Sequence, residues 1–332
     1  MRAVVLVGGF GTRLRPLTLD VPKPMLPVGH RPMIASLVDR LARGGVTDVV
    51  LALGFRPEPF IEAFPDNTCG DVRLSYAVEP EPLDTAGAIR FAADEAGIDD
   101  TFVVANGDVM TDLDVGALVA AHRRFGADAT LHLIGVDDPS AFGVVDLADD
   151  GRVLAFVEKP APGTEPSNLI NAGTYVFEPG VLDLIEPGHR VSVERDTFQR
   201  LVASGTVFGV ATDDYWIDAG RPELYLAATL DLLDGARRFD RCEPIAATAN
   251  VAAEAVITNS VVGEHVTVAA GASVSNSVLL PHAVVEAQAV VERSLVMGVV
   301  GERAVITDTM VGASGVVAAD AVLTAASVPA ES

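Results

Sequence analysis

Hydrophobic and polar positions alternate along the first part of the chain in a pattern that predicts strands followed by helices. Apolar runs rich in Val and Leu predict strands at Ala3–Val7, Val49–Leu53, Leu74–Val78, Phe102–Ala105 and Ala129–Ile134. Apolar residues at helical spacing predict helices at Pro32–Ala42, Thr85–Glu95 and Asp114–Arg124. This alternation indicates an α/β fold with a mainly parallel sheet covered on both faces, whose ligands bind at the carboxyl ends of the strands.

The pattern is less regular between Phe142 and Gly220. Asp149-Asp150-Gly151 predicts a hairpin turn, and Leu169–Phe177 and Val207–Ala211 predict further strands. Arg221–Leu233 then predicts a helix that closes the first domain.

After Cys242 the helical spacing is lost and apolar residues recur at every sixth position. The recurring triplets are Ile245, Val251, Ile257; Val262, Val268, Val274; Leu279, Val285, Val291; and Val311, Val317, Leu323. A longer repeat spaces Ser260, Ser277, Ser294 and Thr309 by 17, 17 and 15 residues. Such hexapeptide repeats predict a parallel β-helix with three short strands per coil. By its resemblance to other hexapeptide proteins, this β-helix is expected to be left-handed, against the usual handedness of parallel crossovers.

The 332 residues are long enough for two domains. We expect a first domain at residues 1–235, a linker at 236–244 and the β-helix at 245–332. The net charge of −23 argues against nucleic acid and anionic membranes as partners. Two distant cysteines, Cys69 and Cys242, and the absence of a long apolar segment or signal peptide predict a cytoplasmic protein without a disulfide framework or zinc site.

The first predicted strand runs into a glycine-rich segment, Gly8-Gly9-Phe10-Gly11-Thr12-Arg13-Leu14-Arg15-Pro16-Leu17-Thr18, followed by Pro22-Lys23-Pro24-Met25. Glycines after a strand let backbone N–H groups approach a polyphosphate closely. Two arginines and a lysine follow Gly11 within twelve residues of an otherwise acidic chain. The dinucleotide-binding fingerprint is broken at Leu14, and a Walker loop would need Gly-Lys-Ser/Thr.

This segment closely resembles the signature of the sugar-1-phosphate nucleotidyltransferases, G-G-x-G-T-R-L-x-P-L-T followed by P-K-P. The resemblance covers essentially the whole chain, including the β-helix. It implies that Gly8, Gly9, Gly11, Thr12 and Arg13 wrap a nucleoside triphosphate and that Lys23 binds its phosphates.

Two aspartates suit a magnesium ion. Asp108 follows the strand Phe102–Ala105, and Asp218 stands in Trp216-Ile217-Asp218-Ala219-Gly220. Mg²⁺ prefers one or two carboxylates together with phosphate oxygens and water. Both positions match the metal-binding aspartates of the family, so the resemblance implies Mg²⁺ on Asp108 and Asp218 and a catalytic set of these two with Arg13 and Lys23.

The resemblance also implies a site for the sugar phosphate. Lys159, in Phe156-Val157-Glu158-Lys159-Pro160, would bind the phosphate, while Glu158 and Asn171 would bind sugar hydroxyls and Gly143 would allow close backbone approach. A carboxylate and an amide can read neighbouring hydroxyls, since both accept and the amide also donates. The set assigned to the sugar phosphate is Gly143, Glu158, Lys159, Asn171, Gly173 and Trp216.

The choice of base rests on fewer residues. Pro22-Lys23-Pro24-Met25 is most similar to the guanylyl branch of the family, and Glu79 stands where thymidylyl members commonly have Gln. A carboxylate can accept from both N1–H and the 2-amino group of guanine. Asp84 occupies a position where the family usually has Gly, which leaves the geometry of the base loop open. The remaining residues assigned to the nucleotide are Leu6, Thr85, Ala86, Gly87, Asn106 and Gly107.

The predicted reaction is transfer of GMP from GTP to mannose 1-phosphate with release of pyrophosphate. Alternatives are another guanylylated sugar or sugar-like 1-phosphate, dTDP- or ADP-glucose synthesis, and a non-catalytic regulatory paralogue that senses nucleotide sugars. An acyltransferase site in the β-helix would need a histidine base between coils. His265 and His282, 17 residues apart next to Gly and Pro, instead predict surface turns. We expect the β-helix to assemble a homo-oligomer through an exposed apolar face.

Overall fold

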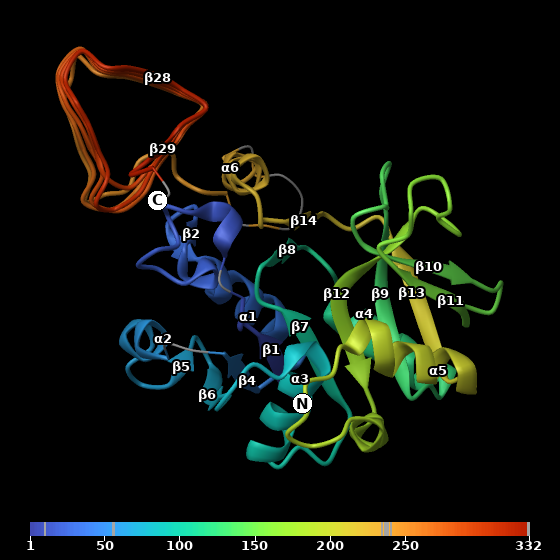
Figure 1. Cartoon of the computed structure of the whole chain (residues 1–332). Helices are drawn as coiled ribbons and strands as arrows, with labels where there is room; N and C mark the ends of the chain where they lie inside the picture. Colours follow the sequence, from blue (N-terminus) through green and yellow to red (C-terminus); the bar gives the residue numbers. More distant parts are fainter. Residues whose placement is uncertain (10, 55–56, 234, 236–238, 240, 331–332) are drawn as a thin grey trace. The chain divides into compact units, whose positions relative to one another are not determined.

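The computed structural model describes residues 1–9, 11–54, 57–233, 235, 239 and 241–330. The chain forms two compact units, Met1–Gly9 with Ala35–Trp216 and Phe10–Ile34 with Ile217–Ser332. Their elements are labelled along the ribbon in Figure 1. The predicted linker lies partly, and the predicted end of the β-helix at 331–332 wholly, outside the described residues, so the expected boundaries stay predictions.

The first unit is built on a sheet with a parallel centre. Its central strands lie in the order β7, β1, β4, β6, all parallel, and antiparallel strands extend both sides of this centre. The bounds are β1 Arg2–Leu6, β4 Asp48–Leu53, β5 Thr68–Cys69, β6 Val72–Val78, β7 Phe102–Asn106, β9 Ala129–Gly135, β10 Gly143–Leu147, β11 Val153–Glu158, β12 Leu169–Phe177 and β13 Val207–Thr212. The predicted strands are confirmed, and the hairpin turn at Gly151 lies between β10 and β11 as expected.

Helix α4 begins and ends at capping residues. In α4, the side chain of Asp114 accepts a hydrogen bond from Ala117 N at 2.9 Å, and Gly126 ends the helix in the left-handed conformation. The three helices predicted before residue 125 are confirmed within one residue at each end. The bounds are α1 Met33–Arg43, α2 Glu58–Ala63, α3 Asp84–Glu95, α4 Val115–Phe125, α5 Phe198–Ser204 and α6 Pro222–Leu230, with a π-helix at Val193–Thr197.

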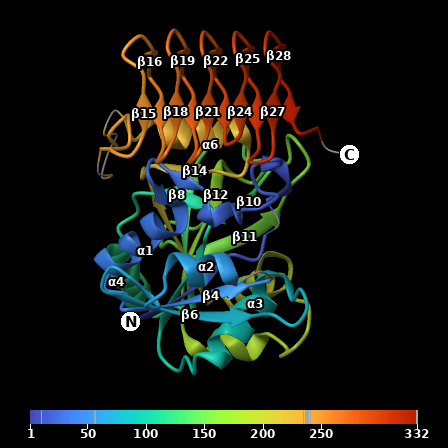
Figure 2. The ribbon, with the colours of Figure 1, turned by 90° about the vertical axis from the view of Figure 1, so that its left-hand side faces the viewer.

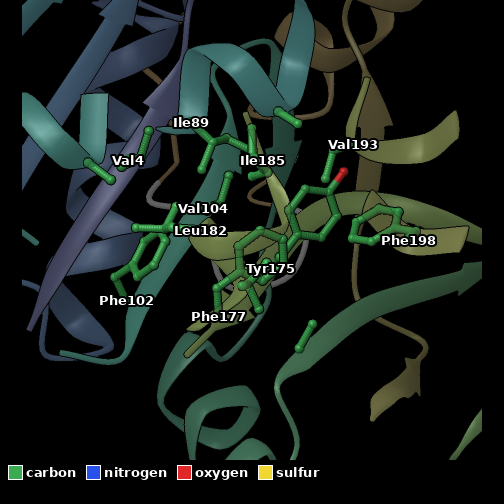
Figure 3. Packing of buried hydrophobic residues seen from close by; sticks show 14 of the residues in the cluster. Val4, Ile89, Phe102, Val104, Tyr175, Phe177, Leu182, Ile185, Val193 and Phe198 are labelled. Atoms are coloured by element: carbon green, nitrogen blue, oxygen red, sulfur yellow. The ribbon is translucent and has the colours of Figure 1, made fainter. Parts of the chain in front are cut away.

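Aromatic rings fill the core of the first unit (Figure 3). Tyr175, Phe177 and Phe198 are completely or almost completely buried. The ring of Phe198 meets that of Tyr175 edge-on with 5.2 Å between centroids. Such offset contacts stabilise beyond the area they bury. This core therefore fixes β12, whose carboxyl-terminal half carries Tyr175 and Phe177.

Helix α6 is shorter than predicted. It begins at Pro222, where a proline suits the first turn, and ends at Leu230 rather than Leu233. The last three predicted residues form turns, because the chain folds back and the Leu232 carbonyl accepts the N–H of Cys242 at 2.9 Å. Among the described residues, no helix is long and apolar enough to cross a bilayer.

The chain after residue 249 forms the predicted parallel β-helix, in which each strand pairs with the strand three further along. In the described chain, three five-stranded sheets result, called here sheets I, II and III (Figure 2). Sheet I is β15 Asn250–Val251, β18 Thr267–Val268, β21 Val284–Val285, β24 Val299–Val300 and β27 Val316–Val317. Sheet II is β16 Val256–Thr258, β19 Ser273–Ser275, β22 Val290–Glu292, β25 Val305–Thr307 and β28 Val322–Thr324. Sheet III is β17 Val261–Val262, β20 Val278–Leu279, β23 Leu295–Val296, β26 Met310–Val311 and β29 Ser327–Val328.

One coil was missed by the hexapeptide count. Val296, Val300 and Ile306 are buried inside the β-helix like the predicted triplets. Only Met297-Gly298 join β23 to β24, whereas four residues join β20 to β21. This shortened corner breaks the six-residue period and explains the spacing of 15.

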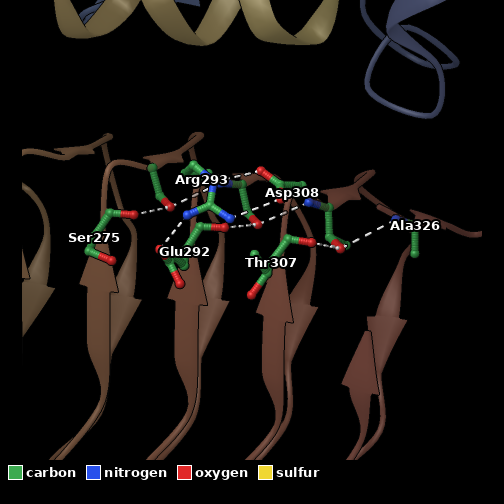
Figure 4. Close-up of polar contacts among 9 residues, drawn as sticks. Ser275, Glu292, Arg293, Thr307, Asp308 and Ala326 are labelled. Atoms are coloured by element: carbon green, nitrogen blue, oxygen red, sulfur yellow. Dashed lines mark hydrogen bonds and ion pairs between the residues drawn. The ribbon is translucent and has the colours of Figure 1, made fainter. Parts of the chain in front are cut away.

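A buried column of hydroxyls links the coils (Figure 4). The Ser277 hydroxyl donates to Ser275 O at 2.7 Å and accepts the N–H of Ser294 at 3.0 Å. The hydroxyls of Ser260, Ser294 and Thr309 make the same pair of contacts one coil apart. Each otherwise unpaired N–H at this corner is thus satisfied. At the surface, Arg293 forms a bidentate pair with Asp308.

Candidate active site

The carboxyl ends of β1 and β7 lie side by side. Leu6, the last residue of β1, pairs with Asn106, the last residue of β7. The N–H of Gly107 donates to Leu6 O at 2.9 Å, and a Cβ at Gly107 would lie 2.5 Å from Val7 Cγ1. Only glycine therefore fits this crossing, which leads directly to Asp108.

Glu79 is the buried carboxylate of this edge. It follows β6, and its Oε2 accepts the N–H of Leu83 at 2.8 Å. Burial raises the pKa of Glu79, and the charge of Asp84 acts in the same direction. Its other oxygen, Oε1, lies 4.0 Å from the position that a Cβ of Gly8 would take. Glu79 and Gly8 therefore share one neighbourhood.

The loop that departs from the family pattern keeps a glycine-like backbone. Asp84 has φ of 62°, the left-handed region that Asp tolerates better than most residues. Its Oδ1 accepts the N–H of Thr85 at 2.8 Å. The backbone at Asp84 is therefore one that glycine also adopts readily.

The residues that follow Asp84 are tied to the segment before the π-helix. The Thr85 hydroxyl donates to Glu194 Oε2 at 2.9 Å and accepts the N–H of Val193 at 2.8 Å. The N–H groups of Ala86 and Gly87 both point to Val191 O. These contacts hold the start of α3 against residues 191–194.

The predicted sugar-phosphate residues lie on β10–β12 or next to their ends, except Trp216, which begins the strand β14 Trp216–Asp218. Gly143 pairs with Glu158 across β10 and β11, and a Cβ at Gly143 would lie 2.5 Å from the Phe156 ring. Lys159 Nζ lies 3.4 Å from Glu158 Oε1, and the lysine side chain is exposed. Its ammonium is accessible to an anion.

Asn171 and Tyr175 form a pair on β12. The Asn171 amide donates to the Tyr175 hydroxyl at 2.8 Å, and its oxygen accepts the N–H of Gly173 at 3.1 Å. Burial and then the charge of Glu194 raise the pKa of Tyr175, with Glu158 and Asp108 acting in the same direction. The negative charges of these three carboxylates therefore act on the Tyr175 hydroxyl, whose direct side-chain partner is Asn171.

Trp216 is anchored in the same region. Its indole N–H donates to Ala172 O at 2.8 Å, and its ring meets Phe142 edge-on. Tyr215, the preceding residue, donates its N–H to the buried carboxylate of Asp112 at 2.6 Å. These contacts fix the chain just before Asp218.

The second unit contains the phosphate segment (residues 11–25) and Asp218. Lys23 is 5% exposed, and its Nζ lies 3.4 Å from Asp218 Oδ1. Arg13, in the short helix Thr12–Leu14, lies with Nη2 4.0 Å from Asp218 Oδ2. Two cations thus flank one carboxylate. The cations could bind phosphates, and the carboxylate is the kind of ligand that Mg²⁺ prefers.

Gly11 and Gly220 make room for this group. Gly11 has φ of 58°, and its carbonyl accepts the Thr18 hydroxyl at 2.8 Å. A Cβ at Gly220 would lie 2.7 Å from Arg13 Nη2 and from Asp218 Oδ1 and 3.0 Å from Lys23 Nζ.

Sequence reasoning assigned no role to Gly220 or Tyr175 and left Glu194 outside the assigned set. For Gly220, the proximity to Asp218 in the sequence was the available signal. Glu194 belongs to a segment, Ser192-Val193-Glu194, that resembles a family segment near the sugar. For Tyr175, an aromatic residue inside a predicted strand gives no hint of a polar contact.

Comparisons with known proteins show which family the chain belongs to. The family model described as nucleotidyl transferase matches residues 2–235. The chain belongs to the nucleotidyl transferase family. A second model, the GlmU-like C-terminal hexapeptide, matches residues 233–323 of this nucleotidyltransferase, in agreement with a left-handed β-helix.

Relatives of this nucleotidyltransferase include a mannose-1-phosphate guanylyltransferase of Mycobacterium tuberculosis, 43% identical over 70% of the chain and 65% of the relative. The mannose-1-phosphate guanyltransferase of Schizosaccharomyces pombe is 39% identical over 78% and 72%. The chain thus spans about two thirds of the length of these relatives.

Among solved structures, HddC from Yersinia pseudotuberculosis, also solved in complex with GMP-PN, is 30% identical. It has a TM-score of 0.59 and covers 69% of this chain and 97% of its own. A putative glucose-1-phosphate thymidylyltransferase from Bacillus anthracis is 25% identical, with a TM-score of 0.64 over 72% of this chain and 96% of its own.

The described residues fit the divalent metal that such enzymes use. They contain no group of three or more His, Cys, Asp or Glu side chains that could enclose an ion. Mg²⁺ differs from such enclosed ions, because it is held by one or two carboxylates while substrate phosphates and water complete its shell. Asp218, partly exposed beside Lys23 and Arg13, offers that kind of ligand.

Proposed function

We propose that this nucleotidyltransferase transfers GMP from GTP to mannose 1-phosphate and releases pyrophosphate. The observation that carries the proposal is the placement of Arg13 and Lys23 on either side of Asp218, in a chain 38–43% identical to mannose-1-phosphate guanylyltransferases. We place the reaction in the cytoplasm.

The reaction requires neutralisation of negative charge more than it requires a general base. A sugar 1-phosphate is already largely dianionic near neutral pH, since the second pKa of a phosphate monoester is about 6. Its oxygen must attack the α-phosphate of another polyanion. Arg13 and Lys23 would offset the repulsion at the triphosphate, and the exposed Lys159 would bind the incoming phosphate. Arg13 would then stay with the leaving pyrophosphate.

We assign Mg²⁺ to Asp108 and Asp218. When bound, it would neutralise charge on the triphosphate. Asp108→Asn and Asp218→Asn should each fold normally and lose most Mg²⁺-dependent turnover, because a neutral amide binds Mg²⁺ more weakly. Turnover is measured against Mg²⁺ concentration, with the exposed Asp114→Asn as control. Activity near that of the parent at low Mg²⁺ would remove the ligand from the assignment.

Recognition of the sugar would fall to the residues around Tyr175. Glu158 and Asn171 carry acceptors and a donor for hydroxyls, and Gly143 lets the Phe156 ring and the Glu158 carboxylate lie close to its backbone. On the nucleotide side, we assign guanine to Glu79, whose buried carboxylate matches the two donors of that base.

The direct test is a matrix of nucleotides against sugar 1-phosphates, read by pyrophosphate release. GTP with mannose 1-phosphate should give the highest kcat/KM. A maximum with dTTP or ATP and glucose 1-phosphate would establish one of the alternative syntheses. No turnover in any combination, with nucleotide sugars still bound, would establish the regulatory paralogue.

We also propose a homo-oligomer assembled through sheet II. Its outward positions include Val256 and Val322, which are 58% and 72% exposed. Exposed β-branched residues in one row suit a contact with a second copy. Val256→Lys with Val322→Lys should lower the mass found by light scattering, whereas Thr324→Lys, also exposed on sheet II, should have a smaller effect. An unchanged mass would place the interface elsewhere.

A further inference from the structure

One face of the β-helix is buried within its own unit. On sheet III, Val262, Leu279 and Val296 point inward, so their neighbours Val261, Val278 and Leu295 point outward. These three outward residues are nevertheless at most 2% exposed. Helix α6 contacts β20 of this sheet. Sheet III is therefore covered by other parts of the second unit (Figure 2).

The cover includes the phosphate segment. Gly312, directly after β26 of sheet III, faces Pro16 so closely that a Cβ at Gly312 would lie 2.8 Å from Pro16 Cβ. The same Cβ would lie 3.0 Å from Pro16 Cγ and from Pro16 O. Gly312 does not have positive φ, so its backbone conformation does not require glycine. What requires glycine is the approach of Pro16.

Pro16 lies in a tightly bonded part of the phosphate segment. Leu14 N donates to Gly11 O and Leu17 N to Leu14 O, each at 2.9 Å. Leu14 and Leu17 are buried on either side of Pro16. A displacement of Pro16 would therefore reach Gly11 and Arg13 through short hydrogen bonds. The buried Leu14 and Leu17 cannot move aside as a long, flexible surface side chain could.

Gly312 itself is held by the β-helix. Its N–H donates to Val328 O and its carbonyl accepts the N–H of Gly315, each at 2.8 Å. The coil thus presents a fixed backbone surface to Pro16.

We propose that the coil containing Gly312 positions the phosphate segment for the nucleotide, which makes Gly312 a positioning residue of the transfer reaction. The expected effect of Gly312 on the kinetics of GTP use rests on the proposed function. It gives the β-helix a part in nucleotide binding in addition to any part in assembly.

The first test is Gly312→Ala in the full chain. Because the added methyl overpacks a filled contact, Pro16 must move. We expect kcat/KM for GTP to fall about tenfold, a change of about 1.4 kcal/mol, with KM for mannose 1-phosphate unchanged. Ser314→Ala, at an exposed position of the same turn, is the matched control and should behave as the parent. An unchanged kcat/KM for GTP in a folded Gly312→Ala protein overturns the inference.

Hydrogen exchange tests the contact without activity. Peptides covering residues 12–26 should exchange faster in Gly312→Ala than in the parent, while peptides covering β7 should not change. If Gly312→Ala fails to fold, the reciprocal variant Pro16→Gly removes the ring atoms from the contact. Residues 310–317 should then exchange faster, and unchanged exchange there overturns the inference. A parent without transferase activity would refute the proposed function alone, since exchange still reports the contact.

Discussion

At the scale of single residues, the site depends on side chains whose surroundings change their chemistry. Glu79 is buried but accepts a backbone N–H, and Asp84 takes a backbone conformation usual for glycine. The effect of Glu79 on nucleotide use and the effect of Asp84 on stability can therefore be measured separately.

Glu79→Gln should weaken the use of GTP. Losing one hydrogen bond to a charged group costs about 1.5–3 kcal/mol, which lowers kcat/KM for GTP roughly ten- to hundredfold. Glutamine also presents a donor, so the preference for GTP over dTTP should narrow. Steady-state kinetics with both nucleotides measure this, with the exposed Glu81→Gln as control. A GTP-to-dTTP ratio within about threefold of the parent would mean that other atoms read the base.

Asp84 provides a test of the loop geometry. A β-branched residue at a left-handed position is strained by about 1–2 kcal/mol, whereas glycine is not. Asp84→Val should therefore lower the free energy of unfolding by about that amount, and Asp84→Gly should stay close to the parent. Urea denaturation of the two variants measures the difference. Equal stability of both would show that the loop relaxes away from this conformation.

At the scale of elements, most strands and helices could be predicted because their period is local. The strand Leu169–Phe177 has the predicted bounds. The coil of Val296, Val300 and Ile306 was missed because its corner is two residues shorter. The π-helix Val193–Thr197 was not predicted, because its five residues form about one turn, which is too short to show a period.

The candidate site was predictable to a smaller extent. Motifs identified Arg13, Lys23 and Asp218, which the structure gathers within 4.0 Å. Motifs could not identify the contact of Gly312 with Pro16. Nearly three hundred residues separate the two, and no sequence motif indicates that they meet. Such contacts arise from the packing of elements.

The hydroxyl column of the β-helix gives a prediction at this scale. Ser277→Ala should lower the free energy of unfolding by about 1–3 kcal/mol, because it leaves the buried N–H of Ser294 without its acceptor. Ser275→Ala, two residues away with its hydroxyl outside the column, should cost less. Chemical denaturation of both variants provides the comparison. Equal losses would show that the column adds no stability.

At the scale of the whole molecule, the phosphate segment and the β-helix belong to one compact unit, although most of the first unit separates them in sequence. Asp108 belongs to the first unit and Asp218 to the second. The stability of both units therefore bears on the proposed chemistry.

Acid should destabilise the fold through His132. This ring is fully buried on β9, where Nε2 contacts the Thr212 hydroxyl at 2.8 Å and lies 3.6 Å from Asp214. The Asp214 carboxylate favours a charged ring, but burial outweighs it and lowers the pKa of His132 to about 4. The unfolded chain therefore binds the extra proton first. This difference in pKa contributes about 3 kcal/mol to the free energy of unfolding. The contribution is fully present above pH 6.5 and should be lost as the pH falls to about 4.

Unfolding free energies measured between pH 4 and 7 test this effect. His132→Phe removes the titrating ring, so its stability should change less with pH even if its absolute stability is lower. A slope equal to that of the parent would assign the acid sensitivity to other groups.

The shortened corner and Gly312 together break the translational symmetry of the β-helix. In a β-helix of identical coils, sheet III could pack against the phosphate segment after a shift by one coil with little cost in free energy. The positions equivalent to Gly312 in the preceding coils are Met297, Leu280 and Gly263. A shift by one coil would bring the side chain of Met297 against Pro16, where even a methyl group does not fit. The glycine at 312 therefore excludes shifts by one or two coils, which would bring Met297 or Leu280 against Pro16.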